Sequence, residues 1–508
     1  MENIPMLTIL GLLPLVGALV AFGVKGRAGR NVAFGFSLLT FAVGFAVFHM
    51  SLHSDLAQTV DWIPQIGAHY ALSVDGMARA MVLLTVILTP LVLAFEWNND
   101  TPHLAAHKTP RWDVNVFGAL ALLVEGFALF VFMSADVLLF YLFFEGSLIP
   151  LFLMIVGWGG EKRRGAALKF LLFSLAGGLV MLVALIGVYA ATSAAGNPTF
   201  LVSEIAAIEI DPRLARWLFA GFFFAFAVKA PMVPVHTWLP DTAEQATPGT
   251  STMLVGVLDK IGTFGMIKFC LGLFGEASQW ASQLVIIVAV VSIFYGAFMA
   301  ITSKNLLRLV AYTSVSHFGF MVLGIFAFTI TSIAGSIFYM LAHGFSSAAM
   351  FFAVGFLVNR RGSAEISDFG GVQRLAPVLA GTFLVSGLAT LGLPGTANFA
   401  GEFSIMVGAF RVIPVMVFVS VIATVLAGLY VLWAYQRVFT GEPTEEVREK
   451  ITDDLGGRER AIIGVLIFLL LFFGFIPRFG ASVSEKTATA TMSQLGIDDP
   501  VNGSIGGK

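Results

Sequence analysis

The sequence predicts an all-α polytopic membrane protein with about fourteen transmembrane helices. The chain is 57% hydrophobic and only 12% charged. Apolar runs of about 20 residues, the length that crosses the hydrocarbon core of a bilayer, recur from end to end. Lys and Arg concentrate in alternate loops between these runs. The longest polar stretches are residues 51–78, 192–213 and 441–459, and none is long enough to form a soluble domain.

The apolar runs define the predicted spans. In chain order they are residues 5–24, 31–50, 79–96, 114–133, 136–157, 166–191, 214–234, 249–273, 280–302, 306–328, 331–358, 376–408, 413–440 and 460–477. Segment 376–408 is longer than the about 20 residues of one straight crossing, which predicts a break inside it.

The distribution of basic residues predicts the orientation. Loops after odd-numbered spans hold 18 of the 29 Lys and Arg residues, including Lys108. Loops after even-numbered spans hold only Arg79, Arg213, Arg216 and Arg411. Because cytoplasmic loops carry the excess of basic residues, the odd loops are placed in the cytoplasm. Both termini are then expected outside, which agrees with an even number of spans.

Composition excludes several classes of function. A formal net charge of −2 argues against a nucleic-acid partner. The single cysteine, Cys270, excludes an internal disulfide and a cysteine-ligated iron–sulfur cluster. No phosphate-binding loop and no recognisable metal-ligand spacing occurs. We therefore expect this chain to bind no cofactor of its own.

Four charged residues lie deep inside predicted spans: Glu145, Lys229, Lys260 and Glu402. A charge at the bilayer centre costs about 2.5–3.5 kcal/mol on insertion scales, and such residues mark proton or ion pathways. Lys229 is the expected partner of Glu145. A static buried pair of these two is the plainer alternative, although such pairs stabilise poorly. The plainer alternative for Lys260 is a structural pairing with Asp259 or with a neighbouring carbonyl.

Histidines and three further residues extend this set. His317 and His343 lie in consecutive spans beside several serines, and histidine titrates near neutrality, which suits a proton relay. One buried histidine alone is more often a core residue. Secondary candidates are Glu125 in the fourth span, His236 just beyond the seventh and Lys268 in the eighth. Glu125 could couple to Glu145 or to another subunit. His236 could be an ordinary loop residue, and Lys268 could instead reach the membrane interface.

Two spans carry internal breaks that divide the chain. Pro231 and Pro234 directly follow the lysine of the seventh span, and the sequence LGLPG precedes the acid of the twelfth. Proline removes a backbone donor and clashes with the preceding turn. The breaks lie five spans apart, so spans 4–8 and 9–13 are expected to form two inverted five-helix repeats, an arrangement that points to a transport site. A kink without any transport role is the alternative.

These repeats set the predicted domain boundaries. Residues 1–113 form an N-terminal three-helix segment, 114–273 the first repeat and 280–440 the second. Residues 441–508 comprise a cytoplasmic loop, the last helix and an outward-facing tail.

Five segments together resemble the antiporter-like membrane subunits of respiratory complex I. They read FYLFFEGSLIP, VLDKIGTFGMIKF, AYTSVSHFGFM, MLAHGFSSAAMFF and LGLPGTANFAGEF, and the resemblance covers roughly residues 110–440. Within that family the chain is most similar to the M type. Its twelfth span carries Glu402, where the L and N types and the D subunit of sodium/proton antiporters usually carry lysine. The chain also ends without the long lateral helix of the L type.

The resemblance implies a proton-translocating subunit of a bacterial NADH:quinone oxidoreductase in the cell inner membrane, with no redox site of its own. NADH, FMN, iron–sulfur clusters and quinone would belong to partner subunits, with L- and N-type subunits as neighbours. Glu145 would be the essential acid, Lys229 its partner, Lys260 the central lysine and Glu402 the terminal acid, with the two histidines between. Alternatives are a sodium/proton antiporter subunit without a redox partner, and a scaffold that only anchors other subunits.

Overall fold

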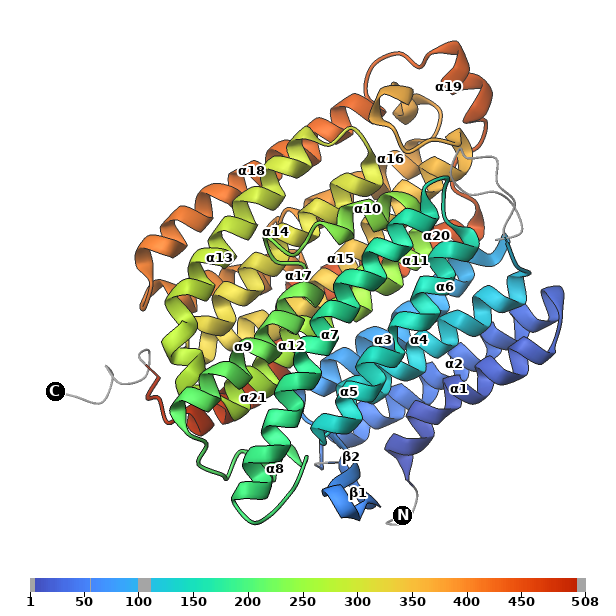
Figure 1. The fold of residues 1–508 in the computed structure, drawn as a ribbon. Coiled ribbons are helices and arrows are strands. Elements are labelled where there is room, and N and C mark those ends of the chain that lie inside the picture. Colours follow the sequence, from blue (N-terminus) through green and yellow to red (C-terminus); the bar gives the residue numbers. More distant parts are fainter. Residues whose placement is uncertain (1–4, 55, 99–110, 500–508) are drawn as a thin grey trace.

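The computed structural model describes residues 5–54, 56–98 and 111–499, and the predicted cytoplasmic Lys108 lies outside them. The described chain is a bundle of long helices that lie side by side (Figure 1). α14 and α15 occupy its middle, α1 and α2 one edge, and α13 and α18 the opposite edge. This arrangement confirms an all-α, multi-pass membrane architecture.

The N-terminal part contains three long helices and a hairpin. In order these are α1 (Met6–Gly23), α2 (Gly26–Ser51), β1 (Leu56–Ile63), β2 (Ala68–Val74) and α3 (Gly76–Phe95). The antiparallel hairpin was not predicted, because residues 51–78 show only a polar stretch in the sequence. Its turn ends at Gly67, whose φ of 67° favours glycine. A side chain there would also meet the carbonyl of Pro198.

The next unit covers predicted spans 4–8. Its elements are α4 (Val114–Met133), α5 (Val137–Gly146), α6 (Leu148–Trp158), α7 (Arg163–Ala194), α8 (Val202–Ile205), α9 (Pro212–Lys229), α10 (Trp238–Gln245), α11 (Pro248–Ser251), η3 (Thr252–Leu258), α12 (Lys260–Gly265) and η4 (Met266–Leu271). The stretches η3 and η4 are π-helical. The predicted fifth span is interrupted at Ser147, because Pro150 has no N–H to pair with the carbonyl of Gly146.

The last part covers predicted spans 9–14. Its elements are α13 (Gly275–Thr302), α14 (Leu306–Phe326), α15 (Ile330–Arg361), η5 (Ile366–Asp368), η6 (Val372–Arg374), α16 (Pro377–Thr390), α17 (Ala397–Phe410), α18 (Pro414–Phe439), α19 (Glu445–Lys450), α20 (Gly457–Phe475) and α21 (Arg478–Leu495). The start of α1, the hairpin and α21 lie at one end of the bundle, and α19 lies at the other (Figure 1). Which end faces outward stays a prediction.

Both predicted breaks are present. α9 ends at Lys229 and the chain turns until α10 begins at Trp238. α16 ends at Thr390, and Gly392 and Gly395, with φ of 78° and 95°, lead into α17. Among the described residues, ten helices are long and apolar enough to cross a membrane. The count of fourteen and the inverted relation of the two units stay predictions.

Exposed apolar side chains mark the surface that faces lipid or other subunits. Val183 on α7 and Phe418 on α18 are 71% and 70% exposed, and Leu284 on α13 is 66% exposed. Large apolar patches of this kind need lipid or protein to cover them. By contrast, α14 and α15 are buried along their whole spanning windows. The centre of the bundle is therefore shielded from lipid, and the predicted relay histidines His317 and His343 lie there.

The predicted outward-facing tail forms the helix α21. It packs across the ends of α3 and α15, where the backbone N–H of Met77 donates to Thr487 Oγ1 at 3.2 Å. Gln494 Nε2 donates to the carbonyl of Gly272 at 2.7 Å. This helix was not predicted, because residues 478–495 are mostly polar and small.

Candidate functional site

Glu145 and Lys229 both lie close to α7. Glu145 is near the end of α5, and its Oε1 contacts α7 so closely that a Cβ on Gly178 would lie 1.6 Å from it. Lys229 is the last residue of α9 and is 1% exposed. Its Nζ lies 5.4 Å from the ring centre of Phe144 and makes no hydrogen bond within the described chain. The two groups interact electrostatically rather than as a close ion pair.

Asp259 lies next to Lys260 in the chain and is fully buried. Its carboxylate interacts electrostatically with Lys229 and with Lys260, and neither oxygen has a hydrogen-bond partner among the described residues. The sequence predicted Asp259 only as a possible partner of Lys260, without a role of its own. Its position inside an apolar span, directly before Lys260, was the sequence feature that could have identified it as a site residue. The structure thus adds an acid between the two predicted lysines.

Lys260 begins α12 and is fully buried between two π-helical stretches. Its Nζ donates to the carbonyl of Val255 at 2.6 Å and lies 2.8 Å from Nδ1 of His343. The ring of Phe318 is 4.9 Å away. Single π-helical turns inside α-helices occur frequently at functional sites. The neighbouring carbonyl that was the plainer alternative is present, but the contact to His343 reaches across to α15.

The two histidines lie close together in the centre of the bundle. His343 on α15 has its Nε2 3.2 Å from Ser314 Oγ on α14. His317 on α14 has its ring centre 5.2 Å from that of His343. Both are at most 3% exposed. The structure therefore brings the predicted histidines together and connects them to Lys260.

Tyr339 connects His317 to Glu402. Its hydroxyl lies 2.5 Å from His317 Nδ1 and donates to Glu402 Oε2 at 3.0 Å. Glu402 on α17 is 6% exposed and lies beside the break, since a Cβ on Gly392 would be 3.4 Å from its Oε2. Tyr339 was not among the predicted site residues, because nothing beside it in the sequence marks it.

The secondary candidates lie outside the contacts that connect Lys260, the two histidines, Tyr339 and Glu402. Glu125 is fully buried in α4 with Thr89 of α3 beside it. His236 lies in the break after α9, where its ring packs edge-on against Tyr295 with centres 4.7 Å apart. Lys268 Nζ donates to the carbonyl of Ser134 at 2.6 Å. Lys268 also lines a cavity of about 680 Å³ that extends to α21.

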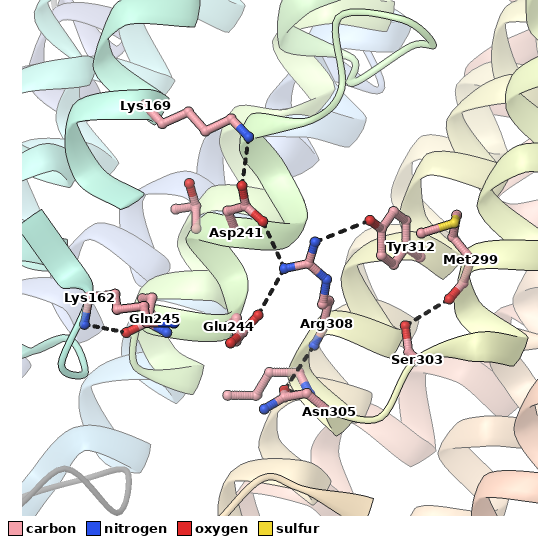
Figure 2. A network of polar contacts seen from close by, with 12 residues as sticks. Lys162, Lys169, Asp241, Glu244, Gln245, Met299, Ser303, Asn305, Arg308 and Tyr312 are labelled. Atoms are coloured by element: carbon pink, nitrogen blue, oxygen red, sulfur yellow. Dashed lines mark hydrogen bonds and ion pairs between the residues drawn. The ribbon is translucent and has the colours of Figure 1, made fainter. Parts of the chain in front are cut away.

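A cluster of ion pairs ties α7 and α10 to α14 (Figure 2). Arg308 on α14 donates to Asp241 at 2.7 Å and to Glu244 at 2.8 Å, both on α10. Lys169 on α7 donates to the other oxygen of Asp241 at 2.6 Å. Burial alone would raise the pKa of Asp241, but the hydrogen bonds and charges of Lys169 and Arg308 hold this pKa below its usual value. The cluster links the two predicted repeats at the end where the basic loops lie.

The central residues form a line of polar contacts through an otherwise apolar core. It runs from Lys260 through His343 to His317, then through Tyr339 to Glu402. The two imidazoles are in ring contact, with centres 5.2 Å apart, and the other steps are hydrogen-bond contacts. Amine, imidazole, phenol and carboxyl groups can each accept and release protons. Across residues 5–54, 56–98 and 111–499, no cluster of three His, Cys, Asp or Glu side chains could hold a metal ion. The chemistry available to the line is proton transfer.

Comparison with known proteins agrees with this chemistry. A family model described as "NADH:quinone oxidoreductase/Mrp antiporter, TM" matches residues 134–427. NADH-quinone oxidoreductase subunit M of Mycobacterium tuberculosis is 42% identical, over 98% of this chain and 96% of that protein. Subunit M of Rhodobacter capsulatus is 36% identical over 94% of each.

Solved structures show the same fold. A chain of respiratory complex I from Thermus thermophilus with bound NADH superposes with a TM-score of 0.87 at 31% identity, covering 97% of this chain and 100% of that one. A chain of the Mrp complex from Dietzia reaches a TM-score of 0.83 at 21% identity, covering 97% and 100%, and shares the fold.

Proposed function

The chain belongs to the family of NADH:quinone oxidoreductase and Mrp antiporter membrane proteins, and from this we propose that it is the M-type, proton-translocating subunit of an NADH:quinone oxidoreductase. The relatives that are 42% and 36% identical are both named subunit M, and each matches this chain over nearly its whole length. Glu402 in the twelfth predicted span, where the L and N types usually carry lysine, supports the M type.

The observation that carries the proposal is the line of contacts from Lys260 to Glu402. Every side chain in it is at most 6% exposed. These polar groups therefore contact one another inside the bundle and not bulk water. Ionisable groups inside a membrane are costly and mark proton relays. In our proposal a proton leaves Lys260 for His343, passes to His317 and leaves the line at Glu402.

Glu145, Lys229 and Asp259 control the proton on Lys260 in this proposal. Lys229 interacts with both acids, so its charge is shared between them. When Glu145 is neutral, Lys229 is left to attract the Asp259 carboxylate. Asp259 then stabilises the charge on Lys260 less, and the lysine releases its proton towards His343. A nearby opposite charge favours the charged form of a group, which is the physical basis of this coupling.

The energy for translocation comes from other subunits. NADH, FMN, iron–sulfur clusters and quinone are placed in those subunits, since this chain supplies no ligand set for them. Its neighbours are proposed to be the L- and N-type subunits in the bacterial inner membrane, with both termini outside. The exposed apolar faces of α7, α13 and α18 are available for those neighbours and for lipid.

The test uses the assembled enzyme in inverted membrane vesicles. Lys260→Ala and Glu402→Gln are expected to remove most proton uptake driven by NADH while native gels still show the full complex. Lys304→Ala is the matched control, because Lys304 is exposed in a loop. Normal proton-to-electron ratios in both core variants would overturn the proposal.

A sodium/proton antiporter without a redox partner is the second candidate, because the family model covers both systems. The likeness to the Mrp complex is at 21% identity and shows the fold alone. Purification from the native membrane separates the two. Co-purifying flavin and iron–sulfur subunits support the first proposal, and sodium-dependent transport without them supports the second.

A further inference from the structure

Tyr339 provides the contact between the histidines and the acid at the end of the line. Its hydroxyl is 2.5 Å from His317 Nδ1 and 3.0 Å from Glu402 Oε2. The three residues come from α14, α15 and α17, so the phenol bridges three separate helices. Tyr339 is fully buried.

The position of this hydroxyl is set by close packing of the backbone. Gly401 on α17 lies against Tyr339, and a Cβ on that glycine would be only 2.8 Å from the Cβ of the tyrosine. α15 and α17 therefore approach more closely than two helices with larger residues here could. The approach brings the carboxylate of Glu402, the next residue, within reach of the phenol.

The pattern of donors indicates a direction. The Tyr339 hydroxyl has one hydrogen, and it donates that hydrogen to Glu402. Nδ1 of His317 must then carry a hydrogen to donate to the phenol oxygen. Nε2 of His317 has no hydrogen-bond partner among the described residues, and so it keeps a lone pair that can accept a proton.

We propose that Tyr339 is a relay residue that passes protons from His317 to Glu402. This rests on the proposed function and adds a residue to its pathway. A proton arriving from the His343 side binds Nε2 of His317. The Nδ1–H bond then breaks as its proton moves to the phenol oxygen, and the original phenol proton moves to Glu402 Oε2. The tyrosine stays neutral and one proton is transferred. Before the next transfer Glu402 releases its proton, the phenol hydroxyl turns back towards Glu402, and His317 returns to its Nδ1–H form by losing the hydrogen at Nε2 and gaining one at Nδ1.

Tyr339→Phe tests the relay because it removes only the hydroxyl. In the assembled enzyme we expect NADH-driven proton uptake to fall by at least about tenfold. The loss should be smaller than the about 100-fold or more expected for removing a positioned proton-transfer group, because a water molecule can enter the space of the hydroxyl. Tyr430→Phe is the matched control. Tyr430 is also buried, and its hydroxyl makes no hydrogen bond within the described chain. It is expected to pump at close to the normal rate.

A solvent isotope measurement separates relay from support. If protons pass through Tyr339, the Phe variant makes their transfer rate-limiting, and turnover coupled to pumping becomes more sensitive to D₂O than in the parent enzyme. A hydroxyl that only holds Glu402 in place would leave this sensitivity unchanged. Tyr339→His, which can still accept and donate a proton, is expected to recover part of the pumping.

The outcomes distinguish the relay from the wider pathway. Normal pumping and a normal isotope effect in Tyr339→Phe, alongside failure of Glu402→Gln, would overturn the relay and leave the proposed function standing. Normal pumping in Glu402→Gln and Lys260→Ala as well would overturn the pathway itself. If Tyr339→Phe does not assemble, Tyr339→His decides, since an assembled His variant without pumping contradicts the relay.

Discussion

Gly178 provides a test of the role of Glu145, because a side chain at position 178 would displace the Glu145 carboxylate without changing Glu145 itself. A Cβ at residue 178 would lie 1.6 Å from Glu145 Oε1, whereas ordinary contact begins at 3.4 Å. In Gly178→Ala the carboxylate must therefore retreat by 1.8 Å, the difference between these two values. This retreat changes the separation between the carboxylate and Lys229, with which it interacts electrostatically.

The expected loss follows from Coulomb's law. If the retreat takes two unit charges from about 5 Å to about 7 Å apart, their attraction at an effective dielectric constant of 20 falls from about 3.3 to about 2.4 kcal/mol. The variant should thus weaken the interaction of Glu145 with Lys229 by about 1 kcal/mol, or about fivefold. We expect proton uptake between that of the parent enzyme and that of Glu145→Gln.

Proton uptake in inverted vesicles, measured with a pH-sensitive dye at matched NADH oxidation rates, gives the readout. Gly165→Ala is the control. It lies on the same helix with nothing within 4 Å of its Cβ, so it shares only the general gain in helix propensity. Glu145→Asp, combined with Gly178→Ala, shortens the acid and should recover part of the loss. If Gly178→Ala pumps as well as Gly165→Ala while Glu145→Gln is inactive, the reasoning about this contact is wrong.

Three further predictions concern other parts of the structure. Asp259→Asn removes the negative charge that both core lysines share, so we expect pumping to fall on the order of tenfold with assembly retained, and normal uptake would contradict its role. The pKa of Asp241 lies below its ordinary value of 3.8 in the folded protein, so the ion-pair cluster stabilises the fold above that pH and loses this contribution as the pH falls further. The melting temperature of Asp241→Asn should therefore lie below that of the parent near pH 7, and the difference should shrink on acidification below about pH 4; a difference independent of pH would argue against the cluster. Gly401→Ala places a methyl group 2.8 Å from Tyr339 and should destabilise the protein by about 1–3 kcal/mol. Gly428→Ala is the control and should not destabilise it, because the space around Gly428 is open. Equal melting curves for the two variants would show that α15 and α17 can separate freely.

Local features of the sequence predicted the breaks well. Pro231 and Pro234 follow Lys229 directly, and α9 ends at that lysine. Gly392 and Gly395 take up positive φ between α16 and α17. Proline and glycine act through their own backbone, so their effect can be inferred without tertiary structure.

Features that depend on distant contacts were missed. Tyr339 became part of the site only because His317 and Glu402 approach it from two other helices, and nothing beside Tyr339 in the sequence marks this. The hairpin of β1 and β2 and the helix α21 are polar enough to look like loops in a membrane protein. Asp259 differs, because an acid beside Lys260 inside an apolar span was a local signal that could have been weighed more heavily.

The helix α15 carries two of the residues in the line, His343 and Tyr339, four positions apart on one face. Each step in the line starts or ends on this helix. A slide of α15 by only about 1.5 Å, the rise of one residue, would strain the bonds to Lys260, His317 and Glu402 together. All steps of the line therefore depend on the axial position of one buried helix.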